Sequence, residues 1–219
     1  MIDARLLQLA SPALPVGAYS YSQGLEAAVE SGVVRDTATA SQWIGEVLEL
    51  SVASMEAPVL ARLIQAWQRG DTDAACRWNL EFIASRETAE LRAETVQMGY
   101  SLRRLLRDLE VATAQLEAIG EVAYPTAFAC AAAAWKLPVP DAIATYVFSW
   151  IENQVLAAVK CVPLGQTDGQ RLMLELGGRI ASLAERAIAM DDDDLANFAP
   201  GLAIASARHE TQYSRIFRS

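Results

Sequence analysis

The side chains of this chain that could perform chemistry are few and widely separated. The only histidine is His209, and the three cysteines, Cys76, Cys130 and Cys161, are too far apart for a zinc knuckle or a CxxC redox pair. Histidine-based metal centres and an HExxH motif are therefore excluded. The chain also lacks a Walker A loop, a GxGxxG motif and a GxSxG elbow. We predict that it has no catalytic residues, binds no cofactor tightly and is not an enzyme.

Carboxylates at helical spacing are the next candidates for a metal site. Glu87, Glu90 and Glu94 could lie on one helix, but a di-iron site needs Glu-x-x-His pairs that this chain cannot supply. We expect the three glutamates to form an exposed helix face, paired with Arg86 and Arg92.

A run of four carboxylates, Asp191–Asp194, follows an amphipathic pattern near the C-terminus. Negative charge opposes the dipole at the end of a helix and so favours its termination. Because flexible surface carboxylates bind divalent ions weakly and unselectively, we predict a solvated linker or cap here and not a metal site.

The segment Ser11–Glu26 is a tightly specified polar bend. Its two prolines fix φ, and Gly17 permits a turn that a β-carbon would hinder. We expect a helix to begin near Ser20 or Ser22, with that hydroxyl as its cap. Glu26 would then lie in or near the positively polarised first turn.

Two further polar clusters lie later in the chain. In the first, Lys160 ends an apolar helical pattern, where its charge suits the helix dipole, and Gln166 and Gln170 follow four residues apart. The second is the terminal segment Ala205–Ser219, which interleaves aromatic side chains with arginines. Disordered tails normally lack aromatic residues, so we expect this tail to become ordered on a partner.

Composition limits the class of protein. The chain of 219 residues carries a formal net charge of -9, which argues against binding nucleic acid by phosphate neutralisation. It has neither a signal peptide pattern nor an unbroken apolar run long enough for a membrane span, so we expect a cytoplasmic location. A hydrophobic content of 53% predicts that a partner or a second copy covers part of the surface.

Apolar residues recur at helical spacing along most of the chain, and sustained alternation typical of strands is missing. We predict an all-α, single-domain bundle of about eight to ten helices, with a flexible N-terminal start and a C-terminal tail. The divisions are an N-terminal segment and turn over residues 1–19, a helical core over 20–190, and an acidic linker and basic, aromatic tail over 191–219. The helical patterns cover Ile44–Met55, Leu60–Trp67 with Gly70 as its stop, Asp71–Ile83, Leu91–Leu109 and Leu172–Ala187, with further helices starting near Pro125 and Pro140. Tyr146–Lys160 is apolar nearly all round, which predicts a buried central helix.

Three motifs, taken together, resemble the UreF family of urease accessory proteins. Leu14–Glu26 is similar to that family's LPxGxYSxSxGLE signature, and Val162–Gln170 is similar to its VPLGQxxGQ block. The ending from His209 onward also resembles the family, with Ile216 where leucine is more usual. No single motif is decisive, but three in this order within an all-α chain of this length are specific.

The resemblance implies an all-α homodimer that acts in urease maturation, the insertion of nickel into the urease active site, without enzymatic activity. The implied partners are a UreD-like protein, also called UreH, the GTPase UreG and the urease apoprotein. Nickel would pass only transiently through the assembled complex, because the chain offers little for a high-affinity site.

The partner-binding or control residues that we expect all lie in these motifs. The tail is expected to order on assembly, and Glu26 and Lys160 are expected on an exposed control surface or a passage toward the metal route. The full set is Tyr19, Tyr21, Glu26, Lys160, Gln166, Gln170, His209, Glu210, Tyr213, Arg215, Phe217 and Arg218.

Two other functions stay open at this point. The first is a helical adaptor protein unrelated to nickel, in which the motifs only stabilise loops. The second is a helical enzyme that uses Tyr19, Tyr21, Glu26 and Lys160 as acid and base groups. A buried, closed cavity lined by all four side chains would support the enzyme.

Overall fold

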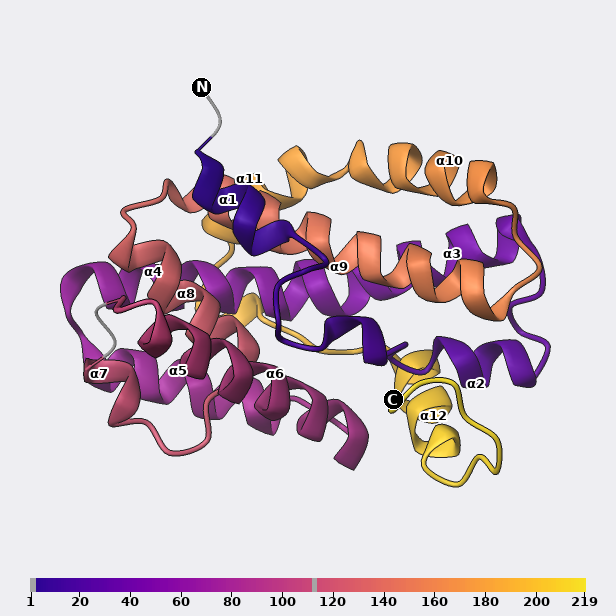
Figure 1. Cartoon of the computed structure of the whole chain (residues 1–219), viewed down its shortest axis with the longest axis horizontal. Helices are drawn as coiled ribbons and strands as arrows, with labels where there is room; N and C mark the ends of the chain where they lie inside the picture. The colour runs from indigo at the N-terminus through magenta and orange to yellow at the C-terminus, as the bar shows by residue number, and fades with distance from the viewer. Residues whose placement is uncertain (1–2, 112–113) are drawn as a thin grey trace.

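The computed structural model describes residues 3–111 and 114–219, and these residues contain helices and no strand. Twelve α-helical segments are joined by two 3-10 turns and one π-helical stretch (Figure 1), and ten of the α-helices in the described residues have seven residues or more. The prediction of an all-α fold with about eight to ten helices is confirmed. The α-helices are α1 Ala4–Ala10, α2 Leu25–Glu30, α3 Thr37–Val47, α4 Ala57–Arg69, α5 Thr72–Ala84, α6 Ala89–Asp108, α7 Ala114–Glu117, α8 Tyr124–Ala134, α9 Val139–Cys161, α10 Gln166–Gly177, α11 Ile180–Ala189 and α12 Pro200–His209. The shorter elements are η1 Ala18–Ser20, the π-helix η2 Leu48–Glu56, and η3 Asp192–Asp194.

Helix α9 is the centre of the bundle, as its apolar sequence predicts. It contacts α1, α2, α3, α4, α8, α10 and α11, and it runs through the middle of the molecule in Figure 1. Its buried side chains include Ile143, Val147 and Ile151, which are fully enclosed. Two apolar residues depart from the prediction, because Phe148 is 40% exposed and Leu156 is 41% exposed on one outer face of the helix.

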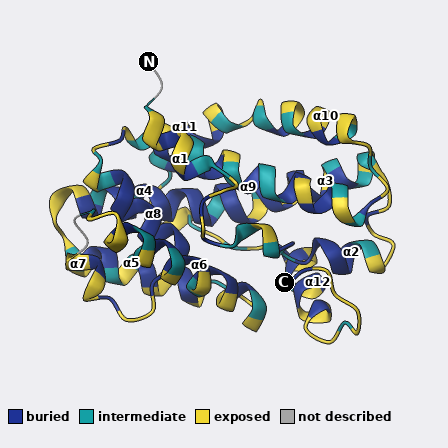
Figure 2. Cartoon of the chain, viewed as in Figure 1, coloured by how far each residue is buried: buried dark blue, intermediate teal, exposed yellow. Residues whose placement is uncertain are grey.

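The core is densest where α8 packs between α4 and α6. Most of α8 is alanine, and its buried residues bring neighbouring backbones close together (Figure 2). At Gly99 in α6, an added Cβ would lie only 2.0 Å from the carbonyl oxygen of Val122, just before α8. Glycine is therefore required here by close backbone approach.

Local signals in the sequence correctly place both ends of α4 and the start of α5. Pro58 lies in the first turn of α4, and Gly70 ends this helix in the left-handed conformation with φ of 70°. Asp71 then caps α5, because its carboxylate accepts a hydrogen bond from the N–H of Ala74 at 2.9 Å.

Two predicted helices differ in extent from the structure. The pattern Leu172–Ala187 predicts one continuous helix, but α10 ends at Gly177 and α11 begins at Ile180. Two adjacent glycines, which are poor helix formers, break the helix although the apolar spacing continues across them.

The predicted helix over Ile44–Met55 is not a regular α-helix throughout. It continues from α3 into the π-helix η2, where the wider winding leaves carbonyl groups for partners outside the helix. The carbonyls of Leu50 and Ser54 accept hydrogen bonds from the N–H groups of Phe198 and Ala196. The linker between α11 and α12 is thus attached along η2.

The acidic run lies in this linker and is exposed, as expected for a solvated segment. Asp192 forms an ion pair with Arg62 at 2.6 Å, and Arg62 also donates to the carbonyl oxygens of Met190 and Pro58. A single arginine of α4 therefore anchors the start of the linker.

Candidate functional site

The polar bend and the C-terminal tail lie against each other and against helix α6. We call this region the tail seam and define it as Tyr19–Glu26, Glu90 and Glu94 of α6, and residues 209–219. Helix α12 contacts both α2 and α6, and the chain then turns back so that its end lies beside α2 (Figure 1). The tail was predicted to become ordered on a partner. It is instead packed on the chain's own residues.

Glu26 is the main holder of the tail backbone. Its Oε1 accepts a hydrogen bond from the N–H of Ile216 at 2.8 Å, and its Oε2 accepts one from the N–H of Phe217 at 2.9 Å. As predicted, Glu26 lies in the first turn of α2, although α2 begins at Leu25 and not at Ser20 or Ser22. Glu26 is buried, so it does not lie on an exposed control surface, and the alternative of a passage toward the metal route stays a prediction.

The start of α2 differs from the predicted serine cap because Gly24, with φ of 75°, occupies the cap position. The hydroxyl of Ser22 still accepts a hydrogen bond from the N–H of Glu26 at 3.3 Å. Ser22 also donates its N–H and its hydroxyl to the carbonyl oxygen of Ser219, at 2.8 and 2.5 Å. Together with the bond from the Arg218 N–H to the Ser20 carbonyl at 2.8 Å, these contacts hold residues 218–219 beside the bend.

His209 lies at the base of the tail and is fully buried. Its Nδ1 is 2.7 Å from Oε2 of Glu90, and its Nε2 is 3.3 Å from Oε2 of Glu26. Arg215 donates to the other oxygen of Glu90 at 2.8 Å. Two tail cations thus contact carboxylates from two different helices of the body whenever His209 carries both protons.

The expectation of an exposed glutamate face on α6 is wrong for Glu90 and Glu94. Glu94 is only 6% exposed, and Glu90 faces the tail. Glu87 is exposed, but Arg86 and Arg92 pair with other residues, Glu56 and Glu121, at 2.8 and 2.9 Å.

A signal for Glu94 was present in the sequence. It lies three residues after Leu91 and four before Met98, which places it on the buried face of the helix.

Phe217 anchors the tail on its apolar side. Phe217 is 5% exposed, and Nζ of Lys160 lies 5.3 Å from the centroid of its ring, within the range of a cation–π contact. Tyr213 and Ile216 point outward instead, with exposed fractions of 102% and 68%. The tail therefore has one buried face and one exposed apolar face.

The remaining predicted residues lie around the seam or away from it. Glu210 accepts a hydrogen bond from the N–H of Ala89 at 3.1 Å and so satisfies a donor at the start of α6. Gln166 and Gln170 are exposed at the start of α10, outside the seam.

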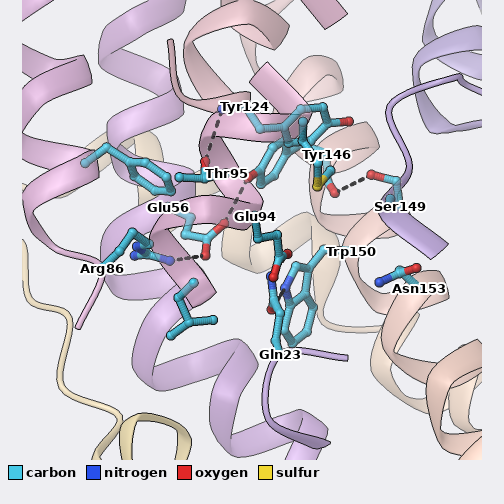
Figure 3. Close-up of a pocket in the computed structure, with 14 residues that line it drawn as sticks. Gln23, Glu56, Arg86, Glu94, Thr95, Tyr124, Tyr146, Ser149, Trp150 and Asn153 are labelled. Atoms are coloured by element: carbon cyan, nitrogen blue, oxygen red, sulfur yellow. Dashed lines mark hydrogen bonds and ion pairs between the residues drawn. The ribbon is translucent and has the colours of Figure 1, made fainter. Parts of the chain in front are cut away.

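A cavity of about 60 Å³, lined by both apolar and polar side chains, adjoins the seam behind Glu94 (Figure 3). Gln23 connects the two: its side chain donates to Oε1 of Glu94 at 2.7 Å and accepts from the indole N–H of Trp150 at 2.8 Å. Ser219 donates to the other oxygen of Glu94 at 2.8 Å. Burial raises the pKa of Glu94 to about 7, although its hydrogen bonds with Gln23 and Ser219 oppose this shift.

On the far side of the cavity, Glu56 ends the π-helix and forms a buried ion pair with Arg86 at 2.8 Å. The hydroxyl of Tyr146 donates to the same carboxylate at 2.9 Å (Figure 3). Burial, together with the nearby negative charge of Glu56, raises the pKa of Tyr146 well above its usual value. This network is fully bonded and leaves the phenol protonated.

The four side chains of the alternative enzyme pocket do not share a cavity. Tyr19 is 64% exposed, whereas Tyr21 is buried, which raises its pKa. Of the two small cavities beside the bend, one is lined by Tyr19, and neither is lined by Tyr21, Glu26 or Lys160. The alternative enzyme required a buried, closed cavity lined by all four side chains, and these cavities do not provide it.

Two further properties bear on function. Within residues 3–111 and 114–219, no cluster of three or more histidine, cysteine, aspartate or glutamate side chains is arranged to hold a metal ion. In the same part of the chain, no helix has both the length and the apolar character to cross a membrane.

Comparison with known proteins gives a consistent result. The UreF family model matches residues 34–177. A protein of Azoarcus sp. (strain BH72) named urease accessory protein UreF is 58% identical over 98% of this chain and 94% of its own length. Proteins of the same name from Dechloromonas aromatica (strain RCB) and Methylobacillus flagellatus are 58% and 52% identical, over 99% and 98% of this chain and 97% and 96% of their own lengths.

Proposed function

We propose that this chain, which belongs to the UreF family of urease accessory proteins, is a scaffold that assembles other proteins during urease maturation. Members of this family are accessory proteins and not catalysts, which agrees with the prediction that the chain is not an enzyme. An adaptor unrelated to nickel has no support from the three relatives reported above, each of which is named as a urease accessory protein.

The partners in this proposal are a UreD- or UreH-like protein, the GTPase UreG and the urease apoprotein, with two copies of this chain in the cytoplasmic complex. Nickel is the cargo and passes through transiently. The GTPase would supply the nucleotide chemistry, and this chain would arrange it. Such coupling requires that two nucleotide states of the GTPase bind the scaffold with different affinities.

The exposed face of the tail is the observation that carries this proposal. Tyr213 and Ile216 project from a segment whose backbone is held by Glu26, and Tyr19 precedes the carbonyl that binds Arg218. Aromatic side chains on an ordered, basic segment are typical of the centres of protein interfaces. The tail seam therefore presents a preformed surface for a protein partner.

Reconstitution tests the proposal directly. Apo-urease, the UreD-like protein and the GTPase are combined with and without this chain, and nickel content and GTP turnover are followed. We expect nickel loading to depend on the chain. Equal loading without it would contradict the proposal.

Single substitutions in the tail test whether its exposed face is the surface that binds the partners. Tyr213→Ala removes only an exposed side chain and should abolish co-purification of the partners without changing thermal stability. Arg215→Ala should have the same effect on assembly, and it should also loosen the tail because the ion pair with Glu90 is lost. Leu174→Ala, at a residue that is 80% exposed on α10, is the matched control. Normal assembly of the Tyr213 and Arg215 variants would place the interface elsewhere.

Glu26→Ala and Lys160→Ala should lower the nickel content of urease, because both side chains hold the tail. Unchanged nickel loading in both variants would limit these two residues to structural support.

A further inference from the structure

A pocket of about 290 Å³ lies between α4, α5 and the linker that follows α11, and we call it the arginine pocket. Three arginines line it, Arg62 and Arg69 from α4 and Arg77 from α5. Two aspartates, Asp71 and Asp192, line it as well, so three positive and two negative charges leave a formal charge of +1. The whole chain carries a net charge of -9. A positively charged hollow is therefore exceptional on this protein.

Both carboxylates of the arginine pocket already have partners on the chain. Asp71 caps α5 by accepting the N–H of Ala74, and Asp192 pairs with Nε of Arg62 at 2.6 Å. The Arg62 side chain is 13% exposed and also donates to two backbone carbonyl oxygens. Arg62 is thus committed to anchoring the linker, and neither aspartate is left to neutralise the other two arginines.

Arg69 and Arg77 have no such commitment. Among the residues that the structure describes, neither forms an ion pair with a carboxylate. The guanidinium carbon of Arg77 lies 5.9 Å from the centroid of the Trp78 ring, which also lines the pocket, so a cation–π contact holds this arginine in place. A guanidinium group has five N–H donors and no acceptor. The pocket therefore offers two positive charges and their donors to an anion from outside the chain.

Charge and size favour a phosphate group as that anion. A phosphate monoester carries a charge of about -1.5 to -2 at pH 7, which balances two guanidinium groups, whereas a single carboxylate would balance only one. Arginine also binds phosphate oxygens through two parallel hydrogen bonds. The volume of about 290 Å³ is close to that of the smaller ligand pockets in proteins. The side chains of Trp78 and Ile188 add apolar surface beside the arginines.

We propose that the arginine pocket is a phosphate site, in which Arg69 and Arg77 bind one phosphate group, either inorganic phosphate or the phosphate of a small organic molecule. The other aspartates of the acidic run, at 191, 193 and 194, do not line the pocket. Their charges still repel an approaching anion, so we expect half-saturation at about 1 mM. The site shares no residue with the tail seam, and its occupancy does not depend on the proposed partners.

The indole N–H signal of Trp78 in ¹H–¹⁵N spectra of the full chain reports binding. Inorganic phosphate, phenyl phosphate and benzoate are titrated separately at pH 7.5 and constant ionic strength. We expect this signal to shift saturably with both phosphates and about tenfold more weakly with benzoate, which lacks the second negative charge. The indole of Trp67, which donates to the Thr126 carbonyl oxygen in the core, should not shift.

The three titrations separate the possible ligands. Tighter binding of phenyl phosphate than of inorganic phosphate would support the site and assign it to an organic phosphate, whereas equal binding would support the site and assign it to free phosphate. No saturable shift with either phosphate, or binding of benzoate as tight as that of phosphate, would overturn the proposal.

Variants assign the binding to the two arginines. Both are exposed, so Arg69→Gln and Arg77→Gln should fold normally, and each should weaken phosphate binding about tenfold. Arg104→Gln on α6 is the matched control, because it removes the same charge from a side chain that is 65% exposed outside the pocket. Asp192→Asn should tighten binding, since it removes a negative charge and frees Arg62. Equal weakening in all three arginine variants would mean that phosphate senses only the net charge, and would overturn the proposal.

Discussion

The helical body and the tail seam are both well buried, but different forces hold them together. In the body, α4, α8 and α9 enclose side chains such as Leu60, Phe128 and Ile151, whose burial is favourable without precise geometry. In the seam the buried groups include Glu26, Glu94 and His209, which are stable only while their partners are present. We therefore expect the seam to open locally while the body stays folded.

The cavity of Figure 3 joins the two regions. Glu56 and Arg86 belong to the body, and Glu94 belongs to the seam, yet all three line the same space. Variants on the two sides of this cavity should therefore separate global stability from tail docking.

The largest effect is expected for Arg86→Met, on the body side. The Arg86 and Glu56 side chains are 5% and 6% exposed, so the variant leaves a buried carboxylate supported mainly by Tyr146. We expect the free energy of unfolding in urea to fall by about 3–5 kcal/mol. The double variant Glu56→Gln/Arg86→Met should recover part of this loss, and a double variant as unstable as the single one would show that the charge is not the cause.

Gly99→Ala should be the next most disruptive change in the body. The new Cβ would meet the carbonyl oxygen of Val122 at 2.0 Å, so α6 must move away from the chain leading into α8. We expect a loss of about 3 kcal/mol in urea unfolding. Gly120→Ala is the control, because a Cβ there meets nothing within 4 Å. Equal stability of the two variants would contradict the close packing of α6.

Most of the body could be predicted from the sequence because its signals are local. Helix α4 is marked by Pro58, its apolar spacing and Gly70, and Asp71 marks the next helix. Apolar spacing fails only where it ignores the backbone, as at the paired glycines 177 and 178, where the pattern continues but the helix does not.

The seam could be predicted only in part, because its partners are far apart in sequence. Glu26 and Phe217 are both in recognisable motifs, but nothing local shows that one binds the backbone of the other. The aromatic tail pattern was interpreted as an anchor for another protein, and Phe217 proves to anchor the tail on its own chain. Glu90 and Glu94 were missed because glutamates on a helix are usually exposed.

The pH dependence of the free energy of unfolding isolates the contribution of Glu94 from that of the body. Its pKa is raised from 4.5 to about 7 in the folded chain, so the folded state binds this proton more tightly than the unfolded state. The contribution is complete below pH 4.5 and is lost as pH rises through about 7. We expect the wild type to lose roughly 2–3 kcal/mol relative to Glu94→Gln between pH 5 and pH 8. Parallel curves of unfolding free energy against pH for the two proteins would show that folding does not raise the pKa of Glu94.

The smallest effect is expected at Lys160, where the seam has a contact that is neither apolar burial nor a hydrogen bond. Lys160→Met keeps an unbranched apolar stem but removes the charge over the ring of Phe217. We expect tail docking, measured by exchange of the Phe217 amide, to weaken by about 0.5–1 kcal/mol, or two- to fivefold. Urea unfolding of the body should change by less than about 0.5 kcal/mol, as for an ordinary partly exposed site. A loss of body stability as large as that of the Gly99 variant would mean that the two regions unfold as one unit.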